Sequence, residues 1–358
     1  MLPIRDCVRQ TPGYVPGEQP QTTDYIKLNT NENPYPPPHE IFNNLEEELK
    51  KVRLYPDPVS TNLRKVAGEV FGFSHEQILA GNGSDDILNI ALRTFVNPGE
   101  TVAFLDPTYS LYETITRVHG ANIKTISTNE NFELDGPLIC PSAKLIFLAS
   151  PNPPLGKHLN RQYLKETCEK ATGVVLIDEA YVDFSDENHW EFIKQYNNVL
   201  VSRTMSKSYS LAGMRVGFAI GSLEIIEQMN KVRDSYNLDR IAQILGANCF
   251  QFQEYFQGIW KQVISTRKRL TTSLKKLDFL VFDSDANFVL ASPQWIDALE
   301  LYTKLKDKKV LVRYFKHPRI SNYVRITVGT DAEIDRLLEV IEQLKNESPN
   351  LRVKSKIS

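Results

Sequence analysis

A single lysine, Lys207, stands between two serines in the stretch SRTMSKSYSLAGMRVGF. Arg215 follows it, and small residues fill most of the interval. An exposed lysine needs no such surroundings, whereas an amine that acts as a nucleophile does, because a pocket lowers its pKa. Taken alone, a lysine is more often a solvated surface residue. If the stretch is instead a functional site, it predicts that Lys207 forms a Schiff base with an aldehyde.

A second candidate site is the sequence AGNGSDD, which follows a predicted strand and precedes a predicted helix. Gly81 and Gly83 resemble a dinucleotide-binding fingerprint, but Asp86 occupies the third glycine position and weakens that interpretation. The backbone N–H groups of Gly83, Ser84 and Asp85 instead suit a phosphate at a helix N-terminus. Taken alone, the stretch is more often an ordinary helix cap.

Two further strand ends carry chemically useful residues. In VVLIDEAYVDF, four apolar residues lead to Asp178, a carboxylate that needs a cationic or N–H partner once it is desolvated. Glu179 and Asp183 are close enough to suggest a metal site, but no histidine stands at ligand spacing and Tyr181 is an unusual neighbour, so we predict no metal. In LDPTYSLY, Tyr109 offers either a stacking surface or a packed loop side chain.

One ligand needs all four of these features. Pyridoxal 5′-phosphate (PLP) carries a phosphate, a flat ring, a pyridine nitrogen that is best kept protonated, and an aldehyde that accepts an amine. Each part has a matching feature in the sequence. The helix N-terminus suits the phosphate, the aromatic side chain the flat ring, the strand-end carboxylate the ring nitrogen, and the pocket lysine the aldehyde. The four stretches together therefore predict PLP as the cofactor.

The elements that must position these residues follow an α/β rhythm. From about residue 60, short apolar runs alternate with amphipathic stretches of helical spacing. The predicted strands are QILAGNG, TVAFLDP, ANIKTIS, AKLIFLASP, GVVLIDEAY, NVLVSRT and RVGFAIGS. Most are apolar on both faces, as expected when helices cover a doubly wound sheet. Ligands of such sheets bind beyond the carboxyl ends of the strands, where the candidate residues fall.

Three parts are predicted along the chain. Residues 1–35 form an extended, non-helical arm that joins the small domain, and its tyrosines give it something to bury. Residues 36–265 form the large PLP-binding domain. Residues 266–358 form a small α+β domain, whose last stretch, SPNLRVKSKIS, we expect to be frayed. One long helix over residues 241–277 is predicted to bridge the two domains.

The composition narrows the class of protein. The 358 residues are 41% hydrophobic and 24% charged, with a net charge of −2, which is typical of a soluble globular protein and gives no sign of nucleic-acid or membrane-surface binding. No apolar run approaches the roughly 18 residues of a membrane span, and the first residues lack a secretion signal. The protein is predicted to be cytoplasmic, with free thiols at Cys7, Cys140, Cys168 and Cys249.

Several motifs resemble those of the fold-type-I PLP-dependent aminotransferases, and among these the histidinol-phosphate aminotransferases. The likeness covers nearly the whole chain and includes TPGYVPG, LNTNENPYPPP, LYPDP, GNGSDDIL, DPTYSLY, SPNPPLG, IDEAYVDF, RTMSKSYSLAGMRVGF and YVRITVGT. It implies a large doubly wound, mostly parallel sheet domain with a small α+β domain. It also implies a homodimer with shared active sites.

The resemblance gives each matching residue a role. Lys207 would bond to the cofactor aldehyde and, once freed by the substrate, would move a proton between the substrate α-carbon and the cofactor. Asp178 would hold the ring N–H, and Tyr181 would bond the ring oxygen. The other cofactor contacts that it implies are Gly83, Ser84, Asp85, Tyr109, Asn152, Thr204, Ser206 and Arg215, with Tyr55 reaching the phosphate in the neighbouring subunit.

One motif departs from the family pattern. The family reads Pro-Asn-Asn-Pro-x-Gly where this chain has SPNPPLG, so Pro153 replaces an asparagine that donates to the ring oxygen. Proline has neither a side-chain donor nor an N–H. Either Asn152 takes the role from one position earlier, or Tyr181 carries the oxygen alone. Losing this hydrogen bond to a charged oxygen would cost on the order of 1.5–3 kcal/mol.

The implied substrates are anions. Arg325 in NYVRITVGT matches the family's anion-binding arginine, and Arg313 in VLVRYF is either a second anion contact or a surface charge. Tyr14 and Asn29 would close the arm over the substrate. The implied reaction interconverts histidinol phosphate and imidazole-acetol phosphate, with glutamate and 2-oxoglutarate, in histidine biosynthesis. Alternatives are an aromatic-amino-acid aminotransferase, a threonine-phosphate decarboxylase, and a binding protein that has lost the chemistry.

Overall fold

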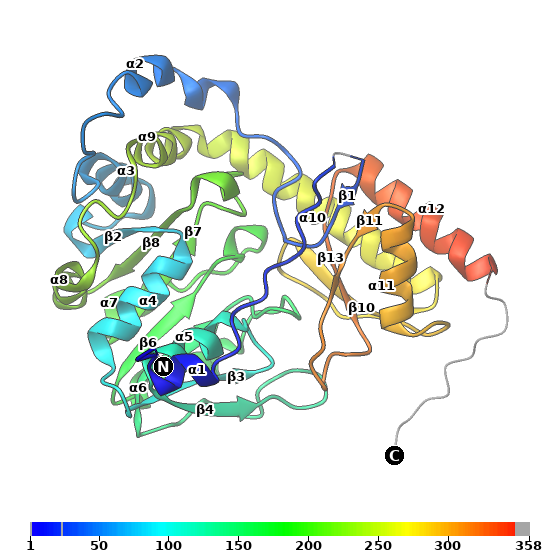
Figure 1. The fold of residues 1–358 in the computed structure, drawn as a ribbon, viewed down its shortest axis with the longest axis horizontal. Helices are drawn as coiled ribbons and strands as arrows, with labels where there is room; N and C mark the ends of the chain where they lie inside the picture. The colour runs from blue at the N-terminus through cyan, green and yellow to red at the C-terminus, as the bar shows by residue number, and fades with distance from the viewer. Residues whose placement is uncertain (1, 23, 348–358) are drawn as a thin grey trace.

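The computed structural model describes residues 2–22 and 24–347, so the predicted frayed end lies outside the described residues. Its main body is a seven-stranded sheet between helices (Figure 1). The strands are β2 (Ile78–Asn82), β3 (Thr101–Asp106), β4 (Asn122–Ser127), β5 (Ala143–Ala149), β6 (Val174–Asp178), β7 (Val199–Thr204) and β8 (Val216–Gly221). They lie in the order β2-β8-β7-β6-β5-β3-β4. β8 is antiparallel to both neighbours and the other pairs are parallel, which confirms the predicted mostly parallel sheet.

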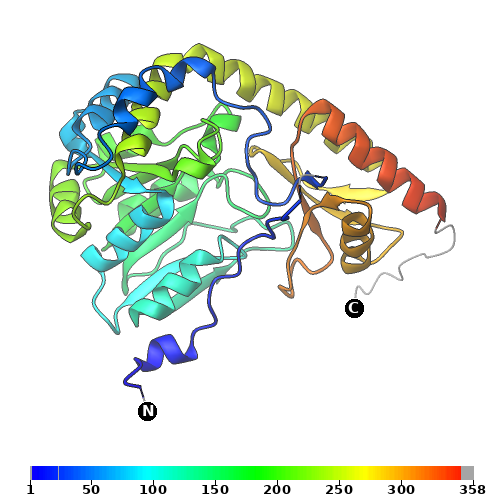
Figure 2. The same cartoon turned by 45° about the horizontal axis from the view of Figure 1, so that its top comes forward.

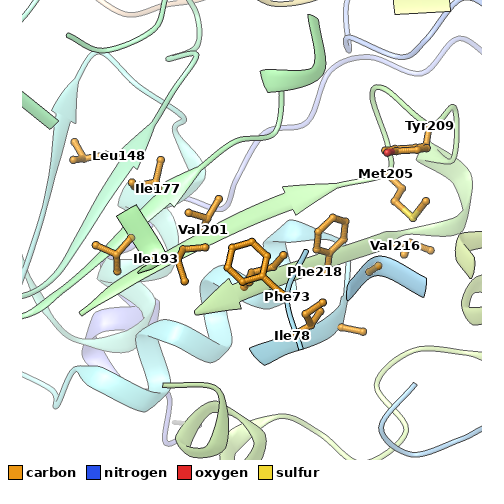
Figure 3. Packing of buried hydrophobic residues seen from close by; sticks show 14 of the residues in the cluster. Phe73, Ile78, Leu148, Ile177, Ile193, Val201, Met205, Tyr209, Val216 and Phe218 are labelled. Carbon is orange, nitrogen blue, oxygen red and sulfur yellow. The ribbon is translucent and has the colours of Figure 1, made fainter. Parts of the chain in front are cut away.

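Apolar side chains on both faces of the strands build the core of this body. On one face, Ile177, Val201 and Phe218 of β6, β7 and β8 are buried in a single cluster that also includes Phe73 (Figure 3). Helices α4 (Ser84–Phe95) and α5 (Leu111–His119) cover the opposite face, where a second cluster is buried. Each fully buried side chain of this size stabilises the fold by about 1.5–3 kcal/mol. The two cores therefore fix the strand ends that carry the candidate site.

The remaining helices of the main body complete its two covering layers. They are α3 (Thr61–Phe71), α6 (Arg161–Lys170), α7 (Trp190–Gln195), α8 (Leu223–Val232) and α9 (Arg240–Cys249). Several begin at a polar residue whose side chain accepts from the first free N–H groups, as Asn160 does for α6 and Ser222 for α8.

A second, smaller body contains an antiparallel sheet with the order β12-β13-β10-β9. Its elements are β9 (Phe279–Val281), β10 (Phe288–Pro293), β12 (Arg313–Tyr314), β13 (Val324–Thr327), α11 (Ala298–Asp307) and α12 (Asp331–Glu347). These elements bury a separate apolar cluster against α10 (Gln253–Lys276). The predicted boundary between residues 265 and 266 falls inside α10, a continuous helix that does not itself mark a division between the two bodies. The domain limits therefore stay a prediction.

The single long helix predicted over residues 241–277 is wrong. The chain forms α9, a 3-10 turn at Phe250–Phe252, and then α10. Phe250 is buried against Phe71 and Phe218, and Phe252 leaves the helical region with φ −112° and ψ 39°. Packing of the Phe250 ring in this aromatic cluster accompanies the break, which helical periodicity alone did not indicate.

The N-terminal arm contacts both bodies. A short helix, α1 (Asp6–Gln10), lies against α5, where Arg5 Nη2 donates to the His119 carbonyl at 3.0 Å, so the prediction of a wholly non-helical arm is wrong. Further along, β1 (Ile26–Lys27) pairs in parallel with β11 (Val310–Leu311). Figure 2 shows the arm running from α1 to the smaller body and returning over the main body to α2 (Leu45–Leu49).

Among the residues described, no helix combines the length and apolarity that crossing a membrane requires.

Candidate active site

A cavity of about 370 Å³ lies at the carboxyl ends of the parallel strands, beside the arm and the smaller sheet. It is the place where an open α/β sheet binds ligands. Most of the predicted residues line it: Tyr14, Asn29, Ser84, Asp85, Tyr109, Asp178, Tyr181, Thr204, Ser206, Lys207, Arg215, Arg313 and Arg325. Gly83, Tyr55 and Asn152 do not line this cavity. The fold thus brings residues from five strand ends to one site.

The backbone at the start of α4 forms a close cradle. Gly83 has φ +80°, and a Cβ built on it would lie 2.6 Å from Nη2 of Arg215. A Cβ on Gly217 of β8 would lie 2.4 Å from the Ser84 backbone nitrogen. Glycine is therefore required at both positions, and Ser84 and Asp85, which open α4, line the cavity. This arrangement suits a phosphate, as predicted.

A cation completes the cradle. Nη1 of Arg215 lies 3.3 Å from Oγ of Ser206, and Nη2 pairs with Oδ2 of Asp85 at 3.1 Å. The Thr204 hydroxyl lies 3.0 Å from the same Ser206 oxygen. The guanidinium and the two hydroxyl groups are donors that a phosphate dianion can use.

The Lys207 side chain is half-buried and lines the cavity. Burial lowers the pKa of Lys207 to about 8, and the positive charges of Arg325 and Arg215 act in the same direction, whereas Glu32 opposes them. Its Nζ donates to the Thr30 carbonyl of the arm at 3.0 Å. At neutral pH a useful fraction of the amine is therefore unprotonated, as a nucleophile requires.

Asp178 ends β6 as a buried carboxylate with two donors. The Tyr112 hydroxyl donates to Oδ2 at 2.8 Å, and the Ala180 N–H donates to Oδ1 at 3.2 Å. Burial raises the pKa of Asp178 to about 6, partly offset by these two hydrogen bonds. Sequence reasoning missed Tyr112, although it stands in the same LDPTYSLY stretch as Tyr109; Tyr112 lies in α5, whereas Tyr109 precedes that helix.

Tyr109 forms a wall of the cavity. Its hydroxyl donates to Oδ1 of Asp85 at 3.2 Å, and its ring meets Tyr14 of the arm edge-on, with the ring centroids 6.1 Å apart. Burial raises the pKa of Tyr109 far above its ordinary value, so the side chain stays neutral. A neutral aromatic ring at this position can stack on a flat ligand.

Asn152 is turned away from the cavity. Its Oδ1 accepts from the Thr108 hydroxyl at 2.6 Å, and its Nδ2 donates to the Pro107 carbonyl at 3.1 Å. Both ends of the amide are thus used within the loops, while the neighbouring Pro151 and Pro153 line the cavity. The Tyr181 hydroxyl instead accepts from Asn31 of the arm at 3.0 Å.

The two predicted substrate arginines differ in what they already bind. Arg325 is half-buried, its Nη2 donates to the Asn29 carbonyl at 3.0 Å, and its buried Nε has no partner among the described residues. Arg313 donates through Nη1 to the Pro16 carbonyl at 3.0 Å and through Nη2 to the Val15 carbonyl at 2.9 Å. Arg325 therefore has a free donor for an anion, whereas Arg313 holds the arm.

The acidic residues that suggested a metal form a buried ion-pair network. Nε of Arg203 donates to Glu179 at 2.8 Å, and its Nη1 donates to Asp183 at 2.9 Å. Glu179 also bonds Nδ1 of His189 at 2.9 Å. Asp183 accepts from the hydroxyl of Ser208, the residue that follows the lysine, at 2.5 Å. The network uses these carboxylates to hold the lysine loop against the end of β6.

Comparison with known proteins agrees with this geometry. Residues 23–341 match the family model of aminotransferase class I and II. The chain is 88% identical over 348 residues to a histidinol-phosphate aminotransferase of Crocosphaera subtropica, covering 97% of this chain and 100% of that one. The chain belongs to the histidinol-phosphate aminotransferases.

Solved structures of histidinol-phosphate aminotransferases share the fold. A crystal structure from Clostridium acetobutylicum has a TM-score of 0.82 at 23% identity, covering 90% of this chain and 99% of that one. A Sinorhizobium meliloti structure in complex with pyridoxal-5′-phosphate has a TM-score of 0.80 at 22% identity, covering 89% and 91%. The class I and II family implies PLP. Residues in and beside the cavity fit it: a backbone turn without a side chain at Gly83, a buried carboxylate at Asp178 and a half-buried amine at Lys207.

Proposed function

We propose that this histidinol-phosphate aminotransferase transfers an amino group between histidinol phosphate and 2-oxoglutarate, giving imidazole-acetol phosphate and glutamate, in histidine biosynthesis. The observation that carries the proposal is that one cavity is lined by the half-buried Lys207 amine, the Asp178 carboxylate and the Arg325 guanidinium, whose Nε has no partner among the described residues. An amine, a carboxylate and an anion site in one cavity are what transamination of an anionic substrate needs.

The side chains divide the work of holding PLP and moving protons. Lys207 would hold the aldehyde, Asp178 the ring N–H, and Tyr181 the ring oxygen. Further holding residues would be Ser84, Asp85, Ser206 and Arg215 at the phosphate, with Thr204 beside it and Tyr109 against the ring. When bound, PLP draws electrons from the substrate carbon that carries the nitrogen. The unprotonated Lys207 amine would accept the proton of that carbon and return it to the cofactor carbon that had carried the aldehyde, on the other side of the nitrogen.

Arg325 would serve both half-reactions. Histidinol phosphate has no α-carboxylate, so its phosphate would occupy the anion site, and a carboxylate of glutamate would occupy it in the second half-reaction. The planar donors of a guanidinium suit both groups. Tyr14 and Asn29 would close the arm over either substrate, since both line the cavity.

The assay that tests the proposal is glutamate formation. Purified protein with PLP, histidinol phosphate and 2-oxoglutarate is expected to release glutamate. Parallel reactions with phenylalanine or tyrosine test the aromatic-amino-acid alternative, and carbon dioxide release from threonine phosphate tests the decarboxylase. The proposal fails if histidinol phosphate yields no glutamate while another amine does, or if no amine reacts at all.

Arg325→Gln is expected to raise KM for histidinol phosphate about 10- to 100-fold, because glutamine removes a charged donor from the substrate anion. Steady-state kinetics measures this change, and a cofactor titration followed by absorbance should show unchanged PLP binding. Arg313→Gln is the matched control. It should raise KM less than Arg325→Gln does, since its donors already hold Val15 and Pro16. A larger effect of Arg313→Gln would reverse this assignment.

A second copy of the chain would complete the site. The Tyr55 side chain is 77% exposed and stacks on Tyr236, with ring centroids 4.5 Å apart, outside its own chain's cavity. Leu49, Val52, Leu54 and Val59 are exposed nearby in the sequence. In a homodimer with shared active sites, these residues would be covered and the Tyr55 hydroxyl would reach the partner's phosphate.

Tyr55→Phe should weaken PLP binding about tenfold, because it removes one hydrogen bond to a charged phosphate but keeps the ring. Sedimentation velocity should show a dimer for both forms of the 40.9 kDa chain. A monomeric wild-type protein, or unchanged PLP affinity in the variant, would refute the shared site.

A further inference from the structure

Asn31 of the arm is held rigidly by the smaller body. It is buried and adopts φ +58°, a left-handed backbone conformation that asparagine tolerates better than most residues. Its backbone N–H donates to the Thr327 hydroxyl at 3.1 Å, and its carbonyl accepts from Nδ2 of Asn287 at 2.9 Å. The residue is thus fixed from two sides, by β13 and by the start of β10.

These contacts also set the direction of the Asn31 side chain. The Thr327 hydroxyl already accepts the backbone N–H, so its own proton goes to Oδ1 of Asn31, 2.9 Å away. Nδ2 of Asn31 then faces the Tyr181 hydroxyl at 3.0 Å and donates to it. A residue of the arm therefore delivers a hydrogen bond to a tyrosine that lies 150 positions later in the chain.

Neighbouring arm residues contact the other reactive side chains. The Asn29 carbonyl accepts from Nη2 of Arg325 and the Thr30 carbonyl accepts from Nζ of Lys207, both at 3.0 Å. Three consecutive residues, Asn29 to Asn31, thus bind three different side chains of the cavity. The arm is part of the site's framework and not only a cover over the substrate.

We propose that Asn31 is a positioning residue that makes Tyr181 a hydrogen-bond donor into the cavity and so offsets the amide donor missing at Pro153. This inference rests on the proposed function, since the group that receives the donated proton is the ring oxygen of bound PLP. Asn152 does not supply the donor, because both ends of its amide are engaged in the loops.

The Tyr181 hydroxyl oxygen carries a single proton. A phenol has one proton to give and can accept from another donor. While Tyr181 accepts from Asn31, its own proton is free for a ligand in the cavity. Burial raises the pKa of Tyr181, opposed by the charge of Arg325, so the phenol keeps that proton at neutral pH. The other titratable groups that interact with Tyr181 are Asp178, Tyr14, Tyr109 and Tyr112.

The test is Asn31→Asp, which reverses one hydrogen bond with little change of shape. Aspartate tolerates φ > 0 and can still accept a hydrogen bond from Thr327. Its carboxylate, however, accepts a hydrogen bond from the Tyr181 hydroxyl, whereas the asparagine amide donates one to it. The ring oxygen of PLP then loses its donor, and negative charge there becomes less stable. The pH at which the absorbance band of bound PLP changes should therefore rise by about one unit.

Tyr181→Phe and the double variant separate the hydrogen bond from simple charge repulsion. If the hydrogen bond causes the shift, Tyr181→Phe raises the pH of the same absorbance transition. Adding Asn31→Asp to Tyr181→Phe then changes that pH no further. A purely coulombic effect of the new carboxylate would instead persist in the Tyr181→Phe background and would overturn the proposal. Asn44→Asp is the matched control, since Asn44 is exposed and has φ +63°. The pH of the PLP absorbance transition in Asn44→Asp should equal that of the wild type.

Two checks keep the outcomes distinct. Asn31→Gly also tolerates the backbone conformation and removes the donor, but it leaves Tyr181 its proton, so it should shift the transition in the same direction by less than Asn31→Asp does. An unchanged transition in the folded Asn31 variants overturns the inference alone. Failure of the wild-type protein to form any PLP absorbance band overturns the proposed function, and this inference with it.

Discussion

Lys207→Ala is expected to lower kcat for amino transfer by at least about 10⁴-fold, because one side chain supplies both the bond to PLP and the proton transfer. Borohydride reduction of the wild-type protein with PLP should leave a stable pyridoxyl adduct on Lys207, which mass spectrometry of peptides locates. The variant should carry no adduct at any lysine. Lys207→Arg is the charge-matched control and should be equally inactive, because a guanidinium stays protonated.

The pH dependence of PLP capture gives an independent check on the same amine. Burial lowers the pKa of Lys207 to about 8 in the protein without PLP. Below that pH the neutral, reactive fraction falls tenfold per unit, so the capture rate should rise with pH and level off above about 8. Stopped-flow absorbance measures this rate. A rate that keeps rising to pH 10 would mean that the amine is an ordinary exposed lysine.

Asp178→Asn is expected to lower kcat about 10²- to 10³-fold, which is the usual effect of removing one preorganised charge from a reacting centre. The amide keeps the shape and can still accept from Tyr112, but it no longer balances a positive ring nitrogen. The pKa of Asp178 is raised to about 6 by burial, so its charge is lost as the pH falls through that value. Wild-type PLP affinity should therefore fall more steeply below pH 6 than that of the variant, which has no carboxylate charge to lose.

Tyr112→Phe is a graded comparison for this prediction. It removes one donor from Asp178 without removing the charge, and it should cost about tenfold in kcat. Equal losses in Tyr112→Phe and Asp178→Asn would show that the hydrogen bond, not the charge, matters. A kcat of Asp178→Asn within threefold of the wild type would contradict the assigned role.

The sequence by itself determined the sheet and the place of the site. Apolar runs that end in polar residues predict strands buried on both faces, and parallel strands bring those ends to one edge. Lys207, Asp178 and the Gly83–Asp85 turn could therefore be placed together from the strand ends and the chemistry of one ligand. Their motifs also carried the resemblance that the family match confirmed.

Only the tertiary structure decided which side chains complete the site. Arg313 and Arg325 are both strand arginines in sequence and both bind the arm, yet Arg325 keeps an Nε without a partner among the described residues. Asn31 and Asn152 are both motif asparagines, yet only Asn31 donates to Tyr181. Local patterns record which residues share a face of a helix or strand. A hydrogen bond between residues 150 or 296 positions apart depends on how the arm, the main body and the smaller body meet, and local periodicity carries no information on that.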